Sequence, residues 1–197
     1  MILKHHLVLT LVRSLRDPAK RATELIPVAD PKHRRRRRGT RSGLLVRLRR
    51  RAHHPPLPSI LLANVQSLIN KVDELRARIS FQRDIKACNI LCFTETWLSG
   101  DILSKLVQPD GFSVHRGDRN KYLSGKQNGG GECFMINDSW CNCSSIQELK
   151  SFCSPGLEYL TIKCRPYYLP REFSLVIVTA VYIPPQADTT TALKELH

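Results

Sequence analysis

The sequence lacks Cys-x-x-Cys pairs, and it has few histidines beyond position 54. It has seven cysteines in all, and the only histidines in that part are His115 and His197. A structural zinc site normally needs four ligands in two close pairs, so the pattern argues against zinc. Cys88 and Cys92 stand in an apolar run and are predicted to be small buried side chains. The odd cysteine count and the lack of an export signal favour a reducing compartment.

Long apolar runs are also missing. The apolar stretch near the start, Leu7–Val12, is preceded by Lys4 and followed at once by Arg13. It is short for an export signal and much too short to cross a bilayer. We therefore expect a short amphipathic helix or no fixed structure in residues 1–16, and no membrane among the partners.

Net positive charge is nearly absent beyond residue 58. Residues 1–58 hold 16 Lys and Arg against three acidic residues, whereas residues 59–197 hold 15 basic and 14 acidic residues. Like charges repel one another and resist compaction, so residues 1–58 are predicted to form a disordered basic arm. Its densest run comprises Arg34, Arg35, Arg36, Arg37 and Arg38. Prolines at positions 55, 56 and 58 mark the boundary to the second unit, residues 59–197.

The second unit has the pattern of an α/β domain. Apolar runs at 59–64 and 89–95 predict buried strands, and apolar residues at helical spacing from Leu68 to Ile79 predict a helix between them. Further strands are predicted at 133–136, 157–164 and 173–183, with a polar loop at 99–131. A final helix is predicted from 187, with Thr189 to Thr191 as its cap.

Several short motifs lie at the predicted strand ends and turns. The first two are Leu62-Ala63-Asn64-Val65-Gln66-Ser67-Leu68 and Cys92-Phe93-Thr94-Glu95-Thr96-Trp97-Leu98. They are followed by His115-Arg116 with Asp118-Arg119, by Gly129-Gly130-Gly131, and by Thr179-Ala180-Val181-Tyr182-Ile183-Pro184-Pro185. In this order and at these spacings the motifs resemble the endonuclease/exonuclease/phosphatase family, specifically the apurinic-type endonuclease domain of LINE-type (non-LTR) retrotransposons. The resemblance spans residues 59–197, which correspond to the N-terminal part of such a domain.

The resemblance implies a fold and a chemistry. The fold is a partial four-layer sandwich of two mixed β-sheets flanked by helices, and the reaction is Mg²⁺-dependent hydrolysis of DNA phosphodiesters. Glu95 is implied as the metal ligand, Asn64 as part of the metal-site network, and Tyr182 as the group that reaches the scissile phosphate. A divalent ion relieves repulsion of the nucleophile and prefers hard oxygen ligands such as Glu95. From the residues alone, Glu95 is a solvated strand end, Asn64 a turn residue and Tyr182 a packing residue.

The His115 region offers a further candidate contact to nucleic acid. His115 lies in a predicted glycine-rich loop, where a surface or hydrogen-bonded role is favoured over a general base. Arg116 and Arg119 are candidates for contacts to DNA phosphates, with a structural role as the alternative.

The sequence also departs from the family. The resemblance implies a later Gly-Asp-Phe-Asn-like motif and an Asp–His pair, and neither follows Tyr182, so we expect little activity. We also expect the incomplete sandwich to expose Val176, Val178 and Val181, which would favour self-association. Glu132 stands where related strands carry an apolar residue, and burial of its carboxylate would be costly.

Two other interpretations stay open. In one, the chain is a nucleic-acid-binding protein that contacts DNA or RNA through the arginine-rich arm, and the same run acts as a nuclear-localisation signal. A nuclear location is then expected, and otherwise a cytoplasmic one. In the other, the chain is a translated relic without a biochemical role, or its arm is a solvated segment with no selected role.

Overall fold

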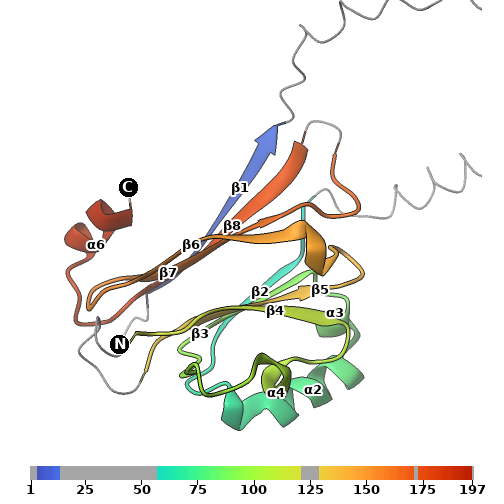
Figure 1. The fold of residues 1–197 in the computed structure, drawn as a ribbon, viewed down its shortest axis with the longest axis horizontal. Coiled ribbons are helices and arrows are strands. Elements are labelled where there is room, and N and C mark those ends of the chain that lie inside the picture. The colour runs from blue at the N-terminus through green and yellow to red at the C-terminus, as the bar shows by residue number, and fades with distance from the viewer. Residues whose placement is uncertain (1–3, 14–56, 121–128, 171–172, 197) are drawn as a thin grey trace, which may run out of the picture.

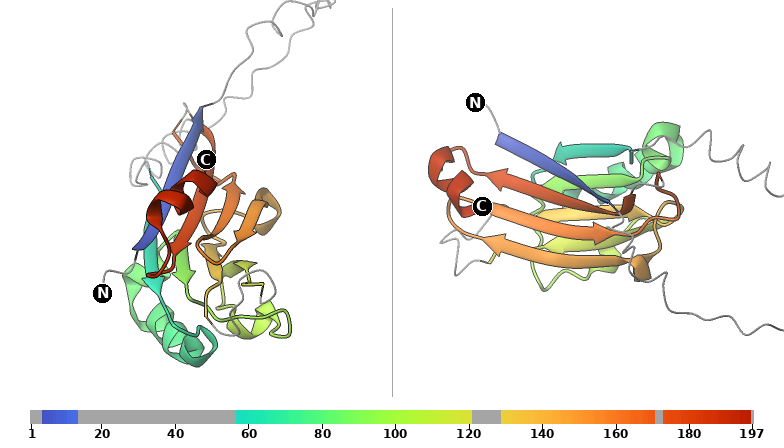
Figure 2. Two further views of the ribbon diagram at one scale, coloured as in Figure 1. Left: turned by 90° about the vertical axis from the view of Figure 1, so that its left-hand side faces the viewer. Right: turned by 90° about the horizontal axis from the view of Figure 1, so that it is seen from above.

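The described part of the protein is built around two four-stranded sheets. A computed structural model describes residues 4–13, 57–120, 129–170 and 173–196. The strand orders are β1-β8-β7-β6 in one sheet and β2-β3-β5-β4 in the other. The sheets lie face to face, and short helices cover the outer face of the second sheet (Figures 1 and 2). The predicted α/β class is therefore confirmed.

The sheet β2-β3-β5-β4 is mixed, as predicted. Its strands are β2 (Ile60–Asn64), β3 (Ile90–Thr94), β4 (Phe112–Gly117) and β5 (Glu132–Asn137). β2 and β3 run parallel with Asn64 opposite Thr94, whereas β5 is antiparallel to both β3 and β4. A parallel pair needs a crossover connection, and the predicted helix between the two strands supplies it.

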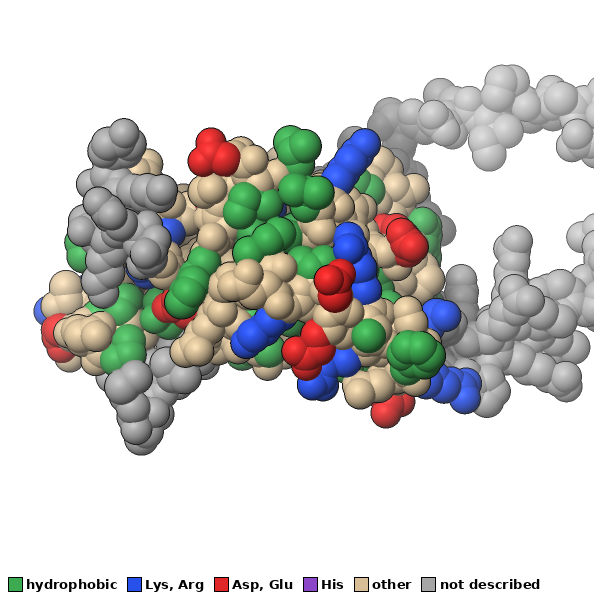
Figure 3. All heavy atoms as spheres, turned by 90° about the horizontal axis from the view of Figure 1, so that it is seen from below, with side chains coloured by type: hydrophobic (Ala, Val, Ile, Leu, Met, Phe, Trp, Pro, Cys, Tyr) green, Lys and Arg blue, Asp and Glu red, His purple; other side chains and the backbone are tan. Residues whose placement is uncertain are grey.

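Short helices pack on the outer face of this mixed sheet. They are η2 (Ile69–Lys71), α2 (Val72–Phe81), α3 (Arg83–Lys86) and α4 (Ser104–Val107). Figure 3 views this helical face, on which basic and acidic side chains are interspersed among apolar ones. Phe81, Leu103 and Leu106 are among its exposed apolar residues. The face therefore carries no single-sign charge field of its own.

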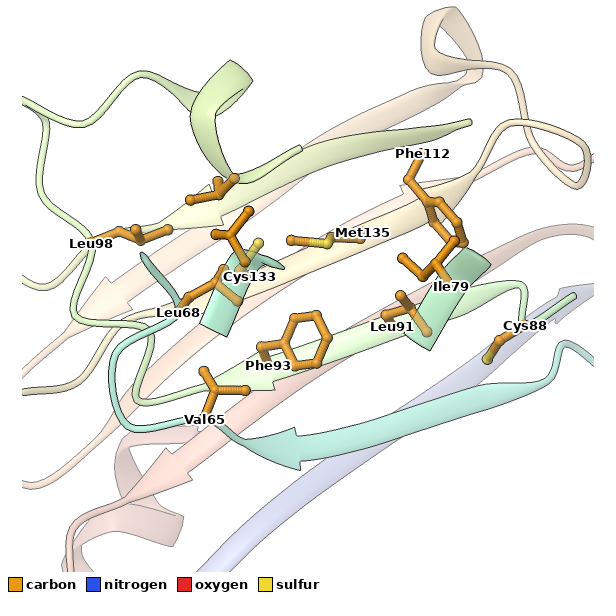
Figure 4. Packing of buried hydrophobic residues seen from close by; sticks show 12 residues of the cluster. Val65, Leu68, Ile79, Cys88, Leu91, Phe93, Leu98, Phe112, Cys133 and Met135 are labelled. Carbon is orange, nitrogen blue, oxygen red and sulfur yellow. The ribbon is translucent and has the colours of Figure 1, made fainter. Parts of the chain in front are cut away.

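A core cluster lies between these helices and the sheet. Leu68, Val72 and Ile79 are buried there, as their helical spacing predicted. Leu91 of β3 and Met135 of β5 belong to the same cluster (Figure 4). The apolar stripe of the crossover helix thus holds the parallel pair β2 and β3 in place.

The other sheet is antiparallel throughout, which corrects the prediction of two mixed sheets. Its strands are β1 (Lys4–Arg13), β6 (Ile146–Cys153), β7 (Glu158–Cys164) and β8 (Phe173–Ile183). β6, β7 and β8 follow one another along the chain through short connections, and antiparallel neighbours need no crossover helix. The predictions of β7 and β8 are confirmed.

β1 corrects the expectation of a helix, or of no fixed structure, at the start of the basic arm. It pairs antiparallel to β8, from Lys4 opposite Ile183 to Arg13 opposite Phe173. The Leu and Val residues of this segment suit a strand, and the open edge of β8 offers backbone partners that the isolated segment lacks. Residues 14–56 of the predicted arm lie outside the described residues.

Besides β1, the strands β4 and β6 and the short helix α4 were not predicted, and the cap of the final helix was assigned to the wrong residues. The stretch 99–131, predicted to be a loop, contains α4 and β4, so His115 lies in a strand rather than in a loop. β6 is mostly exposed, which leaves no alternation of apolar and polar residues to reveal it. The final helix α6 (Thr189–Leu196) is confirmed, but Asp188 caps it by accepting hydrogen bonds from the backbone of Thr190 and Thr191 at 3.3 and 3.0 Å.

Apolar side chains fill the space between the two sheets. Val176 and Val178 of β8 are fully buried in one cluster with Ile90 of β3 and Phe134 of β5. Val181 is also buried, in a cluster that includes a residue of α6. The prediction that these three valines would be exposed is therefore wrong, because the mixed sheet and α6 cover them. These valines are therefore not available for the self-association that was expected from their exposure.

Within the described ranges, no helix is long and apolar enough to span a membrane.

The seven cysteines are all free, and Cys88 and Cys92 are buried as predicted. Burial raises the pKa of the Cys92 thiol well above its ordinary value, and the nearby Cys133 and Glu132 act in the same direction. Cys92 therefore serves as a small core side chain.

The contact between the sheets can be tested with a matched pair of phenylalanines. Phe134 is 0% exposed between the sheets, whereas Phe81 at the end of α2 is 88% exposed. We expect Phe134→Ala to lower the free energy of unfolding by about 3–5 kcal/mol, because it removes buried contacts and leaves a cavity. Phe81→Ala should change it by less than about 0.5 kcal/mol. Urea denaturation measures both, and equal effects would contradict the packed interface.

Candidate active site

The candidate site lies where strand ends of the two sheets meet. β2 ends at Asn64 and β3 at Thr94, which lie opposite each other, and Glu95 follows directly. Tyr182, near the end of β8, comes from the other sheet. Its side chain forms a hydrogen bond with Glu95. The structure therefore brings together the three residues that the resemblance implies for catalysis.

Several donors surround the carboxylate of Glu95. The indole Nε1 of Trp97 and the backbone N–H of Gly130 both donate to its Oε2, at 2.7 and 2.8 Å. Half-burial of the side chain by itself raises its pKa. The hydrogen bonds from Gly130, Tyr182 and Trp97, together with the charge of Arg119, outweigh this and lower the pKa of Glu95 below its ordinary value. The carboxylate is therefore ionised at neutral pH.

Tyr182 joins Glu95 to the antiparallel sheet. Its side chain is buried, and burial together with the hydrogen bond to Glu95 raises the pKa of its phenol well above the ordinary value. Tyr182 therefore keeps its proton at neutral pH and remains a hydrogen-bond donor.

Two loops join side by side beneath the site. The backbone N–H groups of Val65, Ser67 and Leu68 donate to the carbonyls of residues 94, 95 and 96 at 3.0, 2.9 and 2.8 Å. The Oδ1 of Asn64 accepts from the N–H of Gln66 at 3.2 Å, at the start of this turn. Gln66 has a φ of 44°, a conformation that few non-glycine residues adopt. Asn64 thus shapes the turn and stands at the strand end beside Glu95.

The glycine turn 129–131 forms the other wall. Gly130 has a φ of 74°, and a Cβ on it would lie 2.1 Å from the guanidinium of Arg119. The carbonyls of Gly130 and Gly131 accept from the backbone of Trp97 and Thr96 at 3.0 and 3.2 Å. Only glycine satisfies both the positive φ and this close approach, so the turn holds Glu95 and Trp97 from the β5 side.

A buried charged cluster supports the turn from below. The Nε of Arg119 donates to Glu158 Oε1, and the N–H of Gly131 donates to Glu158 Oε2 at 2.8 Å. Both side chains of the ion pair are buried. Glu132 is only 2% exposed, and its Oε1 has no hydrogen-bond partner. Burial, and next the charge of Glu158, raise the pKa of Glu132 well above its ordinary value, while Arg119 opposes them.

The other residues singled out in the sequence lie elsewhere. Arg116 binds Asp118 and donates to the carbonyls of Ile102 and Ser99 at 2.6 and 2.9 Å, so it ties the loop after β3 to β4. The Nδ1 of His115 lies 3.3 Å from Glu148 Oε1 on β6. Arg34 to Arg38 lie outside the described residues.

Sequence reasoning missed Trp97 and the pair Arg119–Glu158 as parts of the site. Arg119 was expected to contact phosphate, and the structure places it in an internal ion pair beside the glycine turn. Glu158 begins the alternating strand β7 and is buried there, so a carboxylate at an inward position was the available signal. Trp97 belongs to the same motif as Glu95, but the positive φ of both residues and the hydrogen bond between their side chains are not marked in the sequence.

Glu95 is the residue of the site that could serve as a ligand to a magnesium ion. Mg²⁺ prefers oxygen ligands and keeps several waters, so one or two carboxylates suffice when a phosphate also binds. Glu95 is half-buried and ionised, and the Asn64 amide ends the neighbouring strand. Among the described residues, no three His, Cys, Asp or Glu side chains converge on one point. The described residues therefore offer one carboxylate at this place and not a complete set of metal ligands.

A groove of about 400 Å³ lies between β2 and α2. Its lining is largely apolar, with Leu61, Leu75 and Phe93, and reaches Asn64 but includes neither Glu95 nor Tyr182. The candidate site is thus a separate surface feature at the strand ends. Neither the known protein families nor the curated proteins compared with this chain give a match.

Replacing Glu132 by Gln tests the buried cluster. A pKa raised in the folded state means that the folded protein binds this proton more tightly than the unfolded chain does. The free energy of unfolding therefore falls as the pH rises above the ordinary glutamate value of 4.5, by up to about 1.4 kcal/mol per pH unit until the folded-state pKa is reached. Glu132→Gln lacks this loss, so its stability relative to the wild type should increase between pH 5 and pH 7.

Urea denaturation at pH 5, 6 and 7 measures this difference. Glu74→Gln is the matched control, because Glu74 is exposed on α2 and pairs with Arg78 across one helical turn. Its difference from the wild type should stay nearly constant over this pH range. A constant difference for Glu132→Gln as well would contradict the raised pKa.

Proposed function

We propose that this chain carries the metal-holding and phosphate-holding part of a Mg²⁺-dependent nucleic-acid endonuclease site. The hydrogen bond between Glu95 and Tyr182 carries the proposal, because it joins residues from two sheets at the end where Asn64 also lies. The family resemblance in the sequence motifs assigns metal binding to the same glutamate and phosphate contact to the same tyrosine.

The charges of the site suit a phosphodiester. Glu95 is the ionised oxygen ligand that would hold Mg²⁺, and the bound ion would neutralise phosphate charge and polarise the scissile bond. Tyr182 keeps its proton and its O–H donates to Glu95, so the phenol lies beside the same carboxylate. Asn64 adds an uncharged amide, which can donate to a phosphate oxygen without attracting a second cation.

The described residues provide no evident general base. Asp188, which follows Tyr182 in the chain, caps α6, and His115 contacts Glu148. General-base catalysis is worth about 10²–10⁴-fold in rate, so cleavage by these residues alone should be slow. We therefore propose Mg²⁺-dependent binding of a phosphodiester strand as the main property of the site.

Substitution of Glu95 tests this proposal. We expect the chain to bind a labelled single-stranded oligonucleotide more tightly in Mg²⁺ than in EDTA. Glu95→Gln should reduce the Mg²⁺-dependent part of the affinity roughly tenfold or more, because it removes the anionic ligand and keeps the shape of the side chain. Fluorescence anisotropy at 300 mM salt measures this, and nicking of supercoiled plasmid measures turnover.

Glu74→Gln is again the matched control and should leave the Mg²⁺ dependence unchanged. Slow nicking that disappears in Glu95→Gln would support the site, and no nicking by either protein is compatible with binding alone. Binding or nicking that proceeds equally in EDTA, or is unchanged in Glu95→Gln, would sink the proposal.

The concentration of arginine in residues 1–58 favours a second property, electrostatic binding of DNA or RNA through the arm. The excess of 13 positive charges in this segment contrasts with a nearly neutral remainder. Arginines that neutralise phosphates release counterions, so such binding weakens steeply with salt. Contacts between the arm and phosphates would add affinity for any nucleic acid. Any preference for a particular strand or sequence would then come from the folded domain.

Replacing Arg34 to Arg38 by glutamine tests the arm. We expect the plot of log affinity against log salt concentration for duplex DNA to lose about one unit of slope for each phosphate contact removed. Anisotropy titrations between 50 and 300 mM salt measure the slope. An unchanged slope in the five-fold variant would show that these arginines do not bind phosphates.

A further inference from the structure

Trp97 is an exposed aromatic residue held rigidly beside Glu95. The residue is 45% exposed. Its Nε1 donates to Glu95 Oε2 at 2.7 Å, and its backbone N–H donates to the carbonyl of Gly130 at 3.0 Å. Two hydrogen bonds therefore fix both ends of the residue while part of the indole stays open to solvent.

The neighbouring residues show why Trp97 is on the outside. Thr96 and Leu98 are buried beneath the loop, whereas Glu95 and Trp97 are less buried and bonded to each other. This alternation places the carboxylate and the indole on one outer side of the segment. The exposed indole therefore belongs to the surface on which the proposed phosphodiester would lie.

The backbone at this point is unusual for a large residue. Glu95 has a φ of 56° and Trp97 a φ of 55°, a region that bulky L-residues rarely occupy. Such conformations cluster at functional sites, where the surrounding structure holds them. Here the glycine turn supplies that support, with Gly130 bonded to both residues.

We infer that Trp97 stacks on a nucleobase next to the phosphodiester bound at Glu95, so that the site favours strands with an unpaired base. This inference rests on the proposed function. An indole face binds any base by stacking, and its N–H is already used by Glu95, so the contact selects an exposed base without reading its identity. A base inside a duplex has both faces covered by its neighbours and cannot stack on Trp97 without being unstacked.

Two strands of equal charge test the inference. The probes are a labelled oligothymidylate and an abasic deoxyribose-phosphate strand of the same length, in Mg²⁺ at 300 mM salt to suppress the arm. The wild type should bind the base-bearing strand roughly tenfold more tightly than the abasic one. Trp97→Phe keeps an aromatic face and loses the N–H, so it should retain most of this ratio, whereas Trp97→Ala should reduce it to about one.

A second measurement uses the intrinsic fluorescence of the chain. The sequence has two tryptophans, so Trp140→Phe leaves Trp97 as the sole emitter. Its emission should be quenched by the base-bearing strand and not by the abasic strand. Because this readout leaves Trp97 in place, it holds even if Trp97→Ala fails to fold.

The outcomes separate the two proposals. Binding that depends on Mg²⁺ and Glu95 but is equal for the two strands, or a ratio that persists in folded Trp97→Ala, would overturn stacking and leave the proposed function intact. A base preference that needs Trp97 but neither Mg²⁺ nor Glu95 would support stacking and overturn the metal role. No difference in quenching between the strands would also overturn stacking.

Discussion

The carboxylate of Glu95 is the point on which the organisation of the site depends. Its Oε2 accepts hydrogen bonds from Trp97 in the same loop and from Gly130 in the turn before β5, and Tyr182 of the other sheet bonds to the same side chain. Three segments far apart in the sequence thus converge on one anion. A neutral side chain at position 95 would be stabilised less by the same donors, because a hydrogen bond to a charged acceptor is stronger than one to a neutral acceptor.

The buried polar cluster beneath the site is a different kind of feature. Arg119 and Glu158 form an ion pair away from water, and Glu132 lies close enough for its pKa to be raised by Glu158. Attraction within a buried pair is offset largely by the loss of hydration, so this cluster is weak evidence for stability. Its effect is geometric, because Glu158 binds the N–H of Gly131 and Arg119 occupies the space that a side chain at residue 130 would need. The cluster therefore fixes the conformation of the glycine turn, in which the N–H of Gly130 donates to Glu95.

Much of the fold followed from local patterns, and the exceptions have physical causes. β2, α2, β3, β5, β7 and β8 each have an apolar period or run that marks them. β4 and β6 do not, since β4 carries Ser113, His115 and Arg116 and β6 is largely exposed. β1 needed the open edge of β8 as its partner, which no local pattern reveals. The valines expected to be exposed are buried because two sheets and α6 meet over them.

By itself, the sequence determined the residue types of the site and their place at strand ends. Asn64 and Glu95 end apolar runs, and in a parallel pair such ends meet at one edge of the sheet, so their proximity followed from the βαβ pattern. Only the tertiary structure decided that Tyr182 reaches Glu95 across two sheets, that Arg119 turns inward to Glu158, and that Trp97 stays at the surface. These contacts depend on how one sheet lies on the other, and that depends on packing over the whole interface, not on the neighbours of any single residue.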